Sequence, residues 1–344
     1  MSTLVRAFAL RAAAITLIVG VLAGCVSRED SSVSQAAPAT VPLSELSDVT
    51  LQIGDQKGGT ESLLRAANAL DGIPYKVAFS TFTSGPPQVE AATAGKIDFA
   101  ITGNTPPIFG AAANAKVKVV SAYDGGGVGD QVLVHADSPI RSIADLRGKS
   151  VLVGKGSSAH GHILAQLQRA GLTTDDVKLV FLQPADAFSA FTKNQADAWA
   201  IWDPYTAQAA EQFPVRTIGQ ARDVTNGYWF GVASDQALAD PKRNSALADF
   251  LVRFEKAAQW ARDHPQEWAR SYADAVGLDL TVAEVSQGRS LRLPTELDDE
   301  VVASEQKIAD LFAESGQIAS APAFENWVDR RYNDVLRSGL VSTN

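Results

Sequence analysis

Phe99-Ala100-Ile101-Thr102-Gly103-Asn104-Thr105-Pro106-Pro107 is the stretch of sequence that decides the fold. A run over 97–101 that is apolar except for Asp98 is followed almost at once by Gly103, polar residues and two prolines. Proline is favoured at the first position of a helix, because the amide there has no helical acceptor and the ring fixes φ. The stretch therefore predicts a strand over 97–101 that leads directly into a helix, with Thr105 as the cap and Pro106 as the first helical residue.

The same succession of strand, turn and helix recurs on both sides of this stretch. Further strands are predicted at 49–53, 75–79, 150–153, 177–182 and 196–201. Each is followed by a turn with polar or proline residues and then by a helical pattern, which favours an α/β fold with parallel sheets. Beyond residue 231 strands become rare, and apolar residues at helical spacing predict a mostly helical tail.

Two groups of such units indicate two lobes with a cleft between them. In open parallel sheets, ligands bind outside the carboxyl ends of the strands, where the helices begin. Free amides, cap hydroxyls and the positive ends of helix dipoles meet at this edge and favour anions. Because these turns recur in both halves of the chain, the sequence predicts an anion-binding cleft.

The N-terminal segment resembles the signal of a bacterial lipoprotein. Arg6 and Arg11 precede an apolar stretch from Ala12 to Leu22, and Ala23-Gly24-Cys25 follow it. Residues 1–24 are thus predicted to be a signal peptide, and Cys25 to become the first mature residue and to carry lipid. The alternative is an ordinary signal or membrane anchor whose boundary holds a cysteine. Residues 25–47, with a Ser/Ala/Pro-rich part over 31–42, are predicted to be a flexible tether.

Composition narrows the class of protein further. The chain has 344 residues and a net charge of −9, which becomes −11 when the two arginines of the signal are removed. An acidic surface argues against nucleic acid, because phosphate binding needs a basic one. The single cysteine excludes a disulfide within one chain. We expect an extracytoplasmic, lipid-anchored monomer of two domains.

Three motifs suggest other functions, and each has a simpler explanation. Residues 154–159 fit a relaxed dinucleotide fingerprint, but no acid ends the next strand, and such cofactors are not expected outside the cytoplasm. His160 and His162 point to different sides of a helix, so a metal site is not expected. No Gly-x-Ser-x-Gly elbow is present. We expect no metal, no cofactor and no catalytic residue.

Specific segments recur in one order along residues 49–336. They are Gly54–Lys57, Gly85-Pro86, Asp98–Pro107, Asp137–Ile140, Leu146–Lys149, Lys155–His160, Leu182–Ala187 and Ala198–Pro204. In this order and spacing the chain is similar to the periplasmic-type substrate-binding proteins of aliphatic sulfonate importers, within the nitrate/sulfonate/taurine group. The resemblance implies a two-lobed periplasmic binding protein fold (type II) that closes on its ligand. It also implies delivery of the ligand to an ABC permease driven by an ATPase.

Carried onto this chain, the resemblance implies a first lobe of residues 48–130 and 231–344 and a second lobe of 131–230. Gly125–Gly129 and Gly227–Gly231 are then the expected hinge regions, because glycine tolerates the dihedral changes of closure. The chain departs from the family at Asn104, where an acid is usual. Asparagine brings an amide donor and removes a negative charge from the anion site, which bears on the ligand accepted.

The residues expected to bind the ligand are those at the helix starts and two tryptophans. They are Gln56, Ser84, Gly85, Gly103, Asn104, Thr105, Ser157, Ser158, His160, Trp202 and Trp229. Hydroxyls, amides and backbone N–H groups would hold the oxygens of a sulfonate, and the tryptophans would shape the side that holds an alkyl tail. The alternatives are taurine, nitrate or a thiamine-precursor pyrimidine as the ligand, or an enzyme of the pyrimidine-precursor synthase type.

Overall fold

The deciding stretch forms a buried strand, β3 (Phe99–Gly103), in the middle of a six-stranded sheet. The computed structural model describes residues 37–341, without the side chains of Asp223, Leu340 and Val341. Strands β1, β2 and β3 are parallel, and β4, β10 and β11 complete the sheet in the order β11-β4-β10-β3-β1-β2. The other five strands are β1 (Thr50–Gln56), β2 (Lys76–Phe82), β4 (Val117–Asp124), β10 (Tyr228–Ser234) and β11 (Leu293–Thr295).

A second sheet of five strands repeats much of this arrangement, with the order β7-β6-β8-β5-β9. Its strands are β5 (Gln131–His135), β6 (Ser150–Val153), β7 (Lys178–Phe181), β8 (Ala198–Ile201) and β9 (Val215–Gln220). Strand β6 pairs in parallel with β7 and β8, whereas β5 is antiparallel to both of its neighbours. The predicted mixed α/β architecture with parallel strand pairs is therefore confirmed.

The predicted strands lead into helices at each expected junction. These helices are α1 (Gly59–Ala66), α2 (Gly85–Thr93), α3 (Thr105–Ala112), α4 (Ser158–Arg169), α5 (Pro184–Thr192) and α6 (Tyr205–Gln212). The details at α3 differ from the prediction by one residue: Asn104 precedes the helix, and Thr105 rather than Pro106 is its first residue. At the start of α6, Asp203 precedes the first helical residue, Tyr205, and its Oδ1 accepts from the amide of Ala207 at 3.2 Å.

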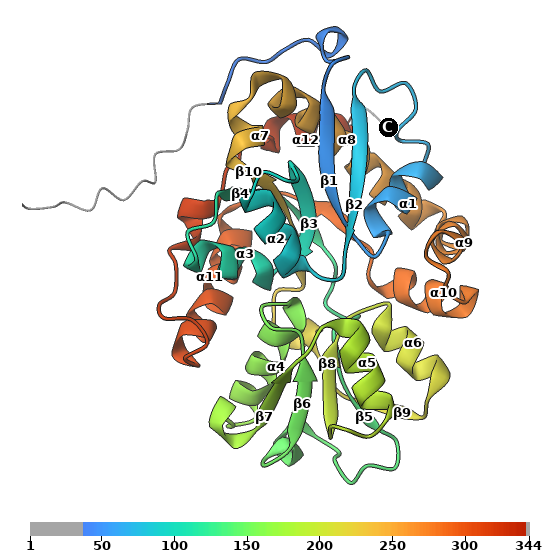
Figure 1. Ribbon diagram of the computed structural model, residues 1–344, viewed down its shortest axis with the longest axis vertical. Coiled ribbons are helices and arrows are strands. Elements are labelled where there is room, and N and C mark those ends of the chain that lie inside the picture. Colours follow the sequence, from blue (N-terminus) through green and yellow to red (C-terminus); the bar gives the residue numbers. More distant parts are fainter. Residues whose placement is uncertain (1–36, 342–344) are drawn as a thin grey trace, which may run out of the picture. The chain divides into compact units, whose positions relative to one another are not determined.

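The helical tail packs on the first sheet (Figure 1). It consists of α7 (Asp235–Ala239), α8 (Pro241–Asp263), α9 (Pro265–Val276), α10 (Leu280–Arg289), α11 (Asp299–Glu314) and α12 (Asn333–Val341). On one face, Ile53 and Phe99 pack against Phe250 and other residues of α8. On the other face, α2, α3 and α11 supply the apolar side chains, so both faces of the sheet are covered.

The chain passes between the two sheets twice, through segments 125–130 and 221–227. These two connections lie side by side: the amide of Gly125 donates to the carbonyl of Gly227 at 3.2 Å, and Ala221 donates to Asp130 at 3.0 Å. A Cβ on Gly127 would lie 2.9 Å from the backbone nitrogen of Arg222, so the close approach requires glycine there. Gly231, in contrast, lies within β10, and a Cβ there would meet Ser121 and Phe99.

The start of the packed chain lies earlier than the predicted end of the tether at residue 47. The amide of Val41 donates to Ser245 at 2.9 Å, and Leu46 is fully buried against the first sheet. The predicted signal peptide and Cys25 lie outside the described residues. Within residues 37–341, none of the helices combines the length and apolar character that crossing a bilayer requires.

Candidate ligand-binding site

The carboxyl ends of β1 and β8 border a cavity of about 40 Å³, which we call the aromatic cavity. This volume is comparable with roughly three water-sized positions. Aromatic rings from both halves of the chain form much of its wall, together with polar and cationic side chains. The lining residues include Gln56, Lys57, Thr83, Trp202, Asp203, Tyr205, Trp229, Trp268, Tyr272, Ser290 and Arg292.

Two cations face the aromatic cavity and are held by rings rather than by carboxylates. The Lys57 ammonium lies 4.8 Å from the ring centroid of Tyr205, and the Arg292 guanidinium lies 4.3 Å from that of Trp229. Neither side chain forms an ion pair or a hydrogen bond with any residue between 37 and 341. Burial lowers the pKa of both groups, but an arginine stays charged at any physiological pH. Asp55, which lies outside the wall, interacts electrostatically with Arg292, but no carboxylate of the wall pairs with either cation.

The Lys57 side chain owes its place to the turn between β1 and α1. Lys57 and Gly58 both adopt positive φ, at 52° and 75°, and this left-handed turn connects the strand to the helix. Asp55 closes the same turn by accepting from the amide of Thr60 at 2.8 Å. Burial raises the pKa of Asp55, while the amides of Thr60 and Glu61 oppose that shift. The turn therefore keeps Asp55 engaged with the helix start.

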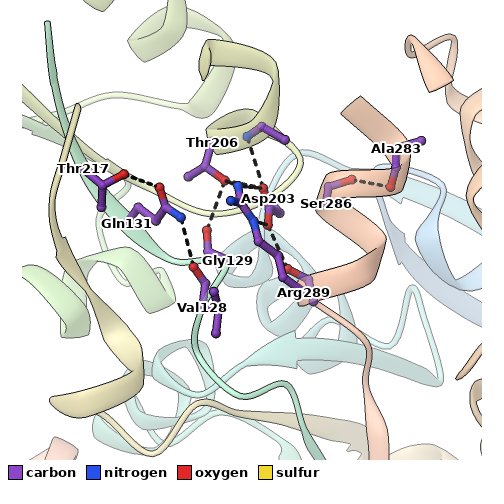
Figure 2. A network of polar contacts seen from close by, with 11 residues as sticks. Val128, Gly129, Gln131, Asp203, Thr206, Thr217, Ala283, Ser286 and Arg289 are labelled. Atoms are coloured by element: carbon purple, nitrogen blue, oxygen red, sulfur yellow. Dashed lines mark hydrogen bonds and ion pairs between the residues drawn. The ribbon is translucent and has the colours of Figure 1, made fainter. Parts of the chain in front are cut away.

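The one carboxylate in the wall of the aromatic cavity, Asp203, is neutralised by an arginine from α10 (Figure 2). Arg289 donates from Nε to Oδ2 at 2.6 Å and from Nη2 to Oδ1 at 2.8 Å. Ser290 and Thr206 also donate to this carboxylate, and Thr206 contacts the carbonyl of Gly129 at 3.2 Å. Asp203 is only 9% exposed. These donors neutralise the Asp203 carboxylate, so it does not repel an anion in the cavity.

A second cavity of about 20 Å³, the glycine cavity, lies along the two connections between the sheets. Gly103, Asn104, Asp130, Ser158, Tyr228, Trp229 and Ser290 contribute to its wall. The end of β3 and the start of α4 approach closely here, because a Cβ on Gly103 would lie 2.9 Å from the Cβ of Ser158. Burial raises the pKa of Asp130 to about 7, against the opposing effect of a hydrogen bond from Ser158.

Asn104 is tied into a buried polar chain behind the glycine cavity. Its Nδ2 donates to Oδ1 of Asn226 at 2.9 Å, and Nδ2 of Asn226 donates to Oε2 of Glu305 at 2.8 Å. Glu305 is fully buried, and burial raises its pKa well above the usual range. Glu305 therefore places a carboxyl two hydrogen bonds away from Asn104.

The structure brings six of the predicted residues to these two cavities. They are Gln56 and Trp202 in the aromatic cavity, Gly103, Asn104 and Ser158 in the glycine cavity, and Trp229 in both. Ser84, Gly85, Thr105, Ser157 and His160 line neither of the two. Their roles as ligand contacts remain predictions.

These five residues have contacts of other kinds in the structure. Ser84 donates to Gln183 at 3.4 Å, and Ser157 donates to the carbonyl of Gly154 at 2.7 Å. A Cβ on Gly85 would lie 2.5 Å from Pro106, and Thr105 donates to the side chain of Asn104 at 3.1 Å. Each of these contacts holds the start of a helix in place or packs it against a neighbouring helix.

His160 lies in an aromatic cluster formed with Phe109, Phe181 and Phe312. Its Nδ1 accepts from the amide of Gly156 at 3.2 Å, so Nε2 carries the proton in the neutral ring. Burial lowers its pKa to about 3, which keeps the ring uncharged. Within residues 37–341, no three His, Cys, Asp or Glu side chains gather as metal ligands.

Sequence reasoning assigned no ligand role to Tyr205, Arg292 or Asp130. Tyr205 directly follows Ala198–Pro204, one of the segments that carry the family resemblance, so its neighbourhood is a usable signal. Trp268 and Tyr272 belong both to the core and to the wall of the aromatic cavity. Arg292 follows no predicted strand, and no local pattern distinguishes it from the other arginines.

The chain matches the NMT1/THI5 like family over residues 77–268. A protein of Escherichia coli (strain K12) that is named for binding aliphatic sulfonates is 35% identical over 277 residues, 79% of this chain and 86% of that protein. The crystal structure of the periplasmic aliphatic sulphonate binding protein from Escherichia coli has a TM-score of 0.72 at 31% identity, covering 82% of this chain and 92% of that one.

A third relative is the alkanesulfonate-binding protein from Xanthomonas axonopodis pv. citri, solved bound to MOPS. It is 28% identical with a TM-score of 0.77, and the match covers 85% of this chain and 100% of that chain. All three relatives are named as binding proteins, which confirms the predicted class of protein and the periplasmic binding protein fold. The chain belongs to the NMT1/THI5-like family and, within it, to the aliphatic sulfonate-binding proteins.

Proposed function

We propose that this protein is the extracytoplasmic binding component of an ABC importer and captures an aliphatic sulfonate. One observation carries the choice of ligand. Lys57 and Arg292 face a cavity walled by aromatic rings, and no carboxylate among residues 37–341 pairs with either cation. A monoanion with an organic tail satisfies both features of this wall at once.

The charge and the acceptor oxygens of a sulfonate match the donors of this wall. The group is ionised at any physiological pH and offers three acceptor oxygens, so its site needs donors and no proton exchange. Gln56, Lys57 and Arg292 supply donors in the aromatic cavity, and Trp202 and Trp229 supply apolar surface for the tail. A hydrogen bond to a charged group contributes roughly 1.5–3 kcal/mol. Three or four of them, less the cost of association, correspond to an affinity near micromolar.

We propose further that closure of two lobes, 48–130 with 231–344 and 131–230, encloses the ligand. Segments 125–130 and 221–227 would be the hinges, because they carry the chain between the two sheets. In that arrangement Ser84, Gly85, Thr105, Ser157 and Ser158 would present backbone or hydroxyl donors at the helix starts. Contacts such as that of Thr83 with Gln183 at 3.2 Å, which join the β2–α2 turn to the start of α5, support closure at this edge.

The periplasmic location named for the Escherichia coli relative supports an extracytoplasmic place for this chain. We propose that lipid on Cys25 anchors the protein to the membrane as a monomer, beside a permease that receives the sulfonate and an ATPase that drives import. Tethering raises the effective concentration of the binding protein at its permease.

A ligand panel tests the proposal. A chain starting at Ser27 would be titrated calorimetrically with ethanesulfonate, MOPS, taurine, nitrate and a thiamine-precursor pyrimidine. We expect ethanesulfonate, which carries no ammonium group, to bind more tightly than taurine, because the cavity wall already carries two cations. Binding of nitrate or the pyrimidine without binding of any sulfonate would overturn the ligand, while formation of a product would indicate an enzyme.

A further inference from the structure

A third cavity, of about 150 Å³, lies apart from the candidate site, between α8, α12 and the region of β11. We call it the Glu255 cavity. Its wall consists of Ser121, Glu255, Pro294, Thr295, Glu296, Leu297, Asn333, Leu336 and Arg337. It shares no lining residue with the aromatic cavity or the glycine cavity. By volume it holds roughly ten water-sized positions, enough for a small organic molecule.

Glu255 is a buried carboxyl that lacks a partner. The residue is only 2% exposed, and Oε2 has no hydrogen-bond partner among residues 37–341. An unpaired polar group in such a position costs free energy that a donor in the cavity would recover. Because Glu255 also lines the cavity, a bound molecule with N–H groups can reach it.

The charges around the cavity favour a cation. The wall contains two carboxyl groups, Glu255 and Glu296, and one guanidinium, Arg337. Arg337 lies toward solvent with its side chain 57% exposed, and it is engaged by Glu296 at 2.5 Å and by Asp334 at 3.1 Å. It therefore does not neutralise Glu255. The remaining titratable neighbour is the phenol of Tyr123, whose hydroxyl accepts from Ser121 at 3.0 Å.

We propose that the Glu255 cavity binds a small organic ammonium ion, with the Glu255 carboxylate as its counter-ion. The apolar side chains of Pro294, Leu297 and Leu336 would contact a short alkyl chain, and the ammonium N–H groups would donate to Glu255. The ligand differs in charge from a sulfonate, so this site is independent of the proposed importer function.

The binding should depend on pH with a defined sign. Burial raises the pKa of Glu255 to about 8, so the carboxyl is mostly protonated at pH 6 and mostly ionised at pH 9. An ammonium ion binds the ionised form, and its apparent affinity falls with the fraction of that form. We expect binding to weaken 10- to 100-fold between pH 9 and pH 6.

Isothermal titration calorimetry with n-propylammonium chloride tests the proposal, with sodium chloride as the ionic-strength control. At pH 9 we expect binding to the wild type and at least a tenfold loss in Glu255→Gln, which keeps the shape of the side chain and removes its charge. Glu90→Gln, at an exposed carboxylate on α2, should bind like the wild type. Tetramethylammonium, which cannot donate a hydrogen bond, should bind more weakly than propylammonium.

A second pair of variants covers the case in which Glu255→Gln fails to fold. Leu336→Phe should narrow the cavity and reduce propylammonium binding with Glu255 intact. Val335→Phe, at a 38% exposed position of the same helix, should not. Circular dichroism would establish folding of each variant. Absence of binding to the wild type at pH 9, or equal affinity in the wild type and Glu255→Gln, would overturn the proposal.

Discussion

The guanidinium of Arg292 lies 4.3 Å from the ring centroid of Trp229, so a cation from the helical tail is held against a strand of the first sheet. Arg292→Met removes that charge from the aromatic cavity. We expect sulfonate affinity to fall about 10- to 100-fold, corresponding to one charged hydrogen bond of roughly 1.5–3 kcal/mol. Calorimetry provides the measurement. Arg262→Met, at an exposed pair with Asp263, is the control and should change the affinity little.

Asn104→Asp tests the glycine cavity. The substitution replaces the amide that donates to Asn226 by a carboxylate oxygen, and it adds negative charge to a cavity that shares Trp229 and Ser290 with the proposed sulfonate site. We expect at least a tenfold loss of sulfonate affinity, and a smaller loss for Ser157→Ala, whose hydroxyl is engaged by Gly154. Titrations of both variants at one pH provide the comparison. Wild-type affinity in both would remove these residues from the site.

The pair formed by Asp203 and Arg289 should be important for stability. Arg289→Met leaves a carboxylate that is 9% exposed without its main partner. Removing one member of a buried pair costs several kcal/mol, and because Arg289 is partly exposed we expect about 2–4 kcal/mol in urea unfolding. The double variant Asp203→Asn with Arg289→Met should lose less. Arg65→Met breaks an exposed pair with Glu61, and a loss there as large as that in Arg289→Met would contradict this explanation.

The raised pKa of Asp130 should make the stability of the protein depend on pH. Burial raises the pKa of Asp130 to about 7 from the ordinary value of 3.8, so the folded state binds a proton that the unfolded chain releases. Its stabilising contribution is complete below about pH 4 and is lost as the pH rises through 7. Asp130→Asn should therefore gain stability relative to the wild type between pH 5 and pH 8, by at most about 4 kcal/mol.

Urea unfolding of both proteins at the two pH values measures that change. Parallel pH profiles would mean that Asp130 does not titrate in this range. Because Asp130 lines the glycine cavity, its ionisation should also oppose a bound anion. Sulfonate affinity should then be higher at pH 6 than at pH 8 in the wild type, and nearly constant in Asp130→Asn.

Cys25→Ser tests the anchor proposed for the N-terminal segment. The variant should lose both lipid attachment and the cleavage that depends on it, and remain as an unprocessed precursor. A chain starting at Ser27 behind an ordinary secretion signal should bind sulfonate with unchanged affinity, because the packed chain begins only near Val41. Radiolabelled palmitate incorporation is the assay. Equal labelling of the wild type and Cys25→Ser would place the lipid elsewhere.

The parallel strands and their helix starts could be predicted because each leaves a local signature. An apolar run such as 97–101, followed by glycine, polar residues and proline, specifies its own turn. The antiparallel strands β4, β5, β9, β10 and β11 were not predicted. Strands β4, β5 and β9 lead into connections rather than into such turns, and β10 runs directly into α7 without a turn of glycine and proline. Gln56, Trp202 and Trp229 are predicted ligand contacts, and all three line the aromatic cavity. Gln56 ends β1, Trp202 directly follows β8, and Trp229 lies on β10.

Arg292 could not be identified in this way. Its place depends on β11 pairing with β4 and on α10 reaching the second sheet, and both depend on contacts between distant parts of the chain. The surroundings of His160 also depend on distant parts of the chain. Its position at a helix start predicts a ligand contact, which stays a prediction, and the rings of Phe109 and Phe312 from other helices pack around it. Local patterns identify candidate donors, whereas long-range pairing decides which of them share a cavity.

The insertion of the second sheet between β4 and β10 also sets an order for completing the two halves. Strands β5 to β9 form a continuous piece of chain, so that sheet can assemble as soon as residue 220 is available. The first sheet needs β10 between β3 and β4, and its edge strand ends only at Thr295. A growing chain therefore carries β3 and β4 without β10, the strand that lies between them, until about a hundred further residues have been synthesised. Contacts of such high sequence separation form slowly.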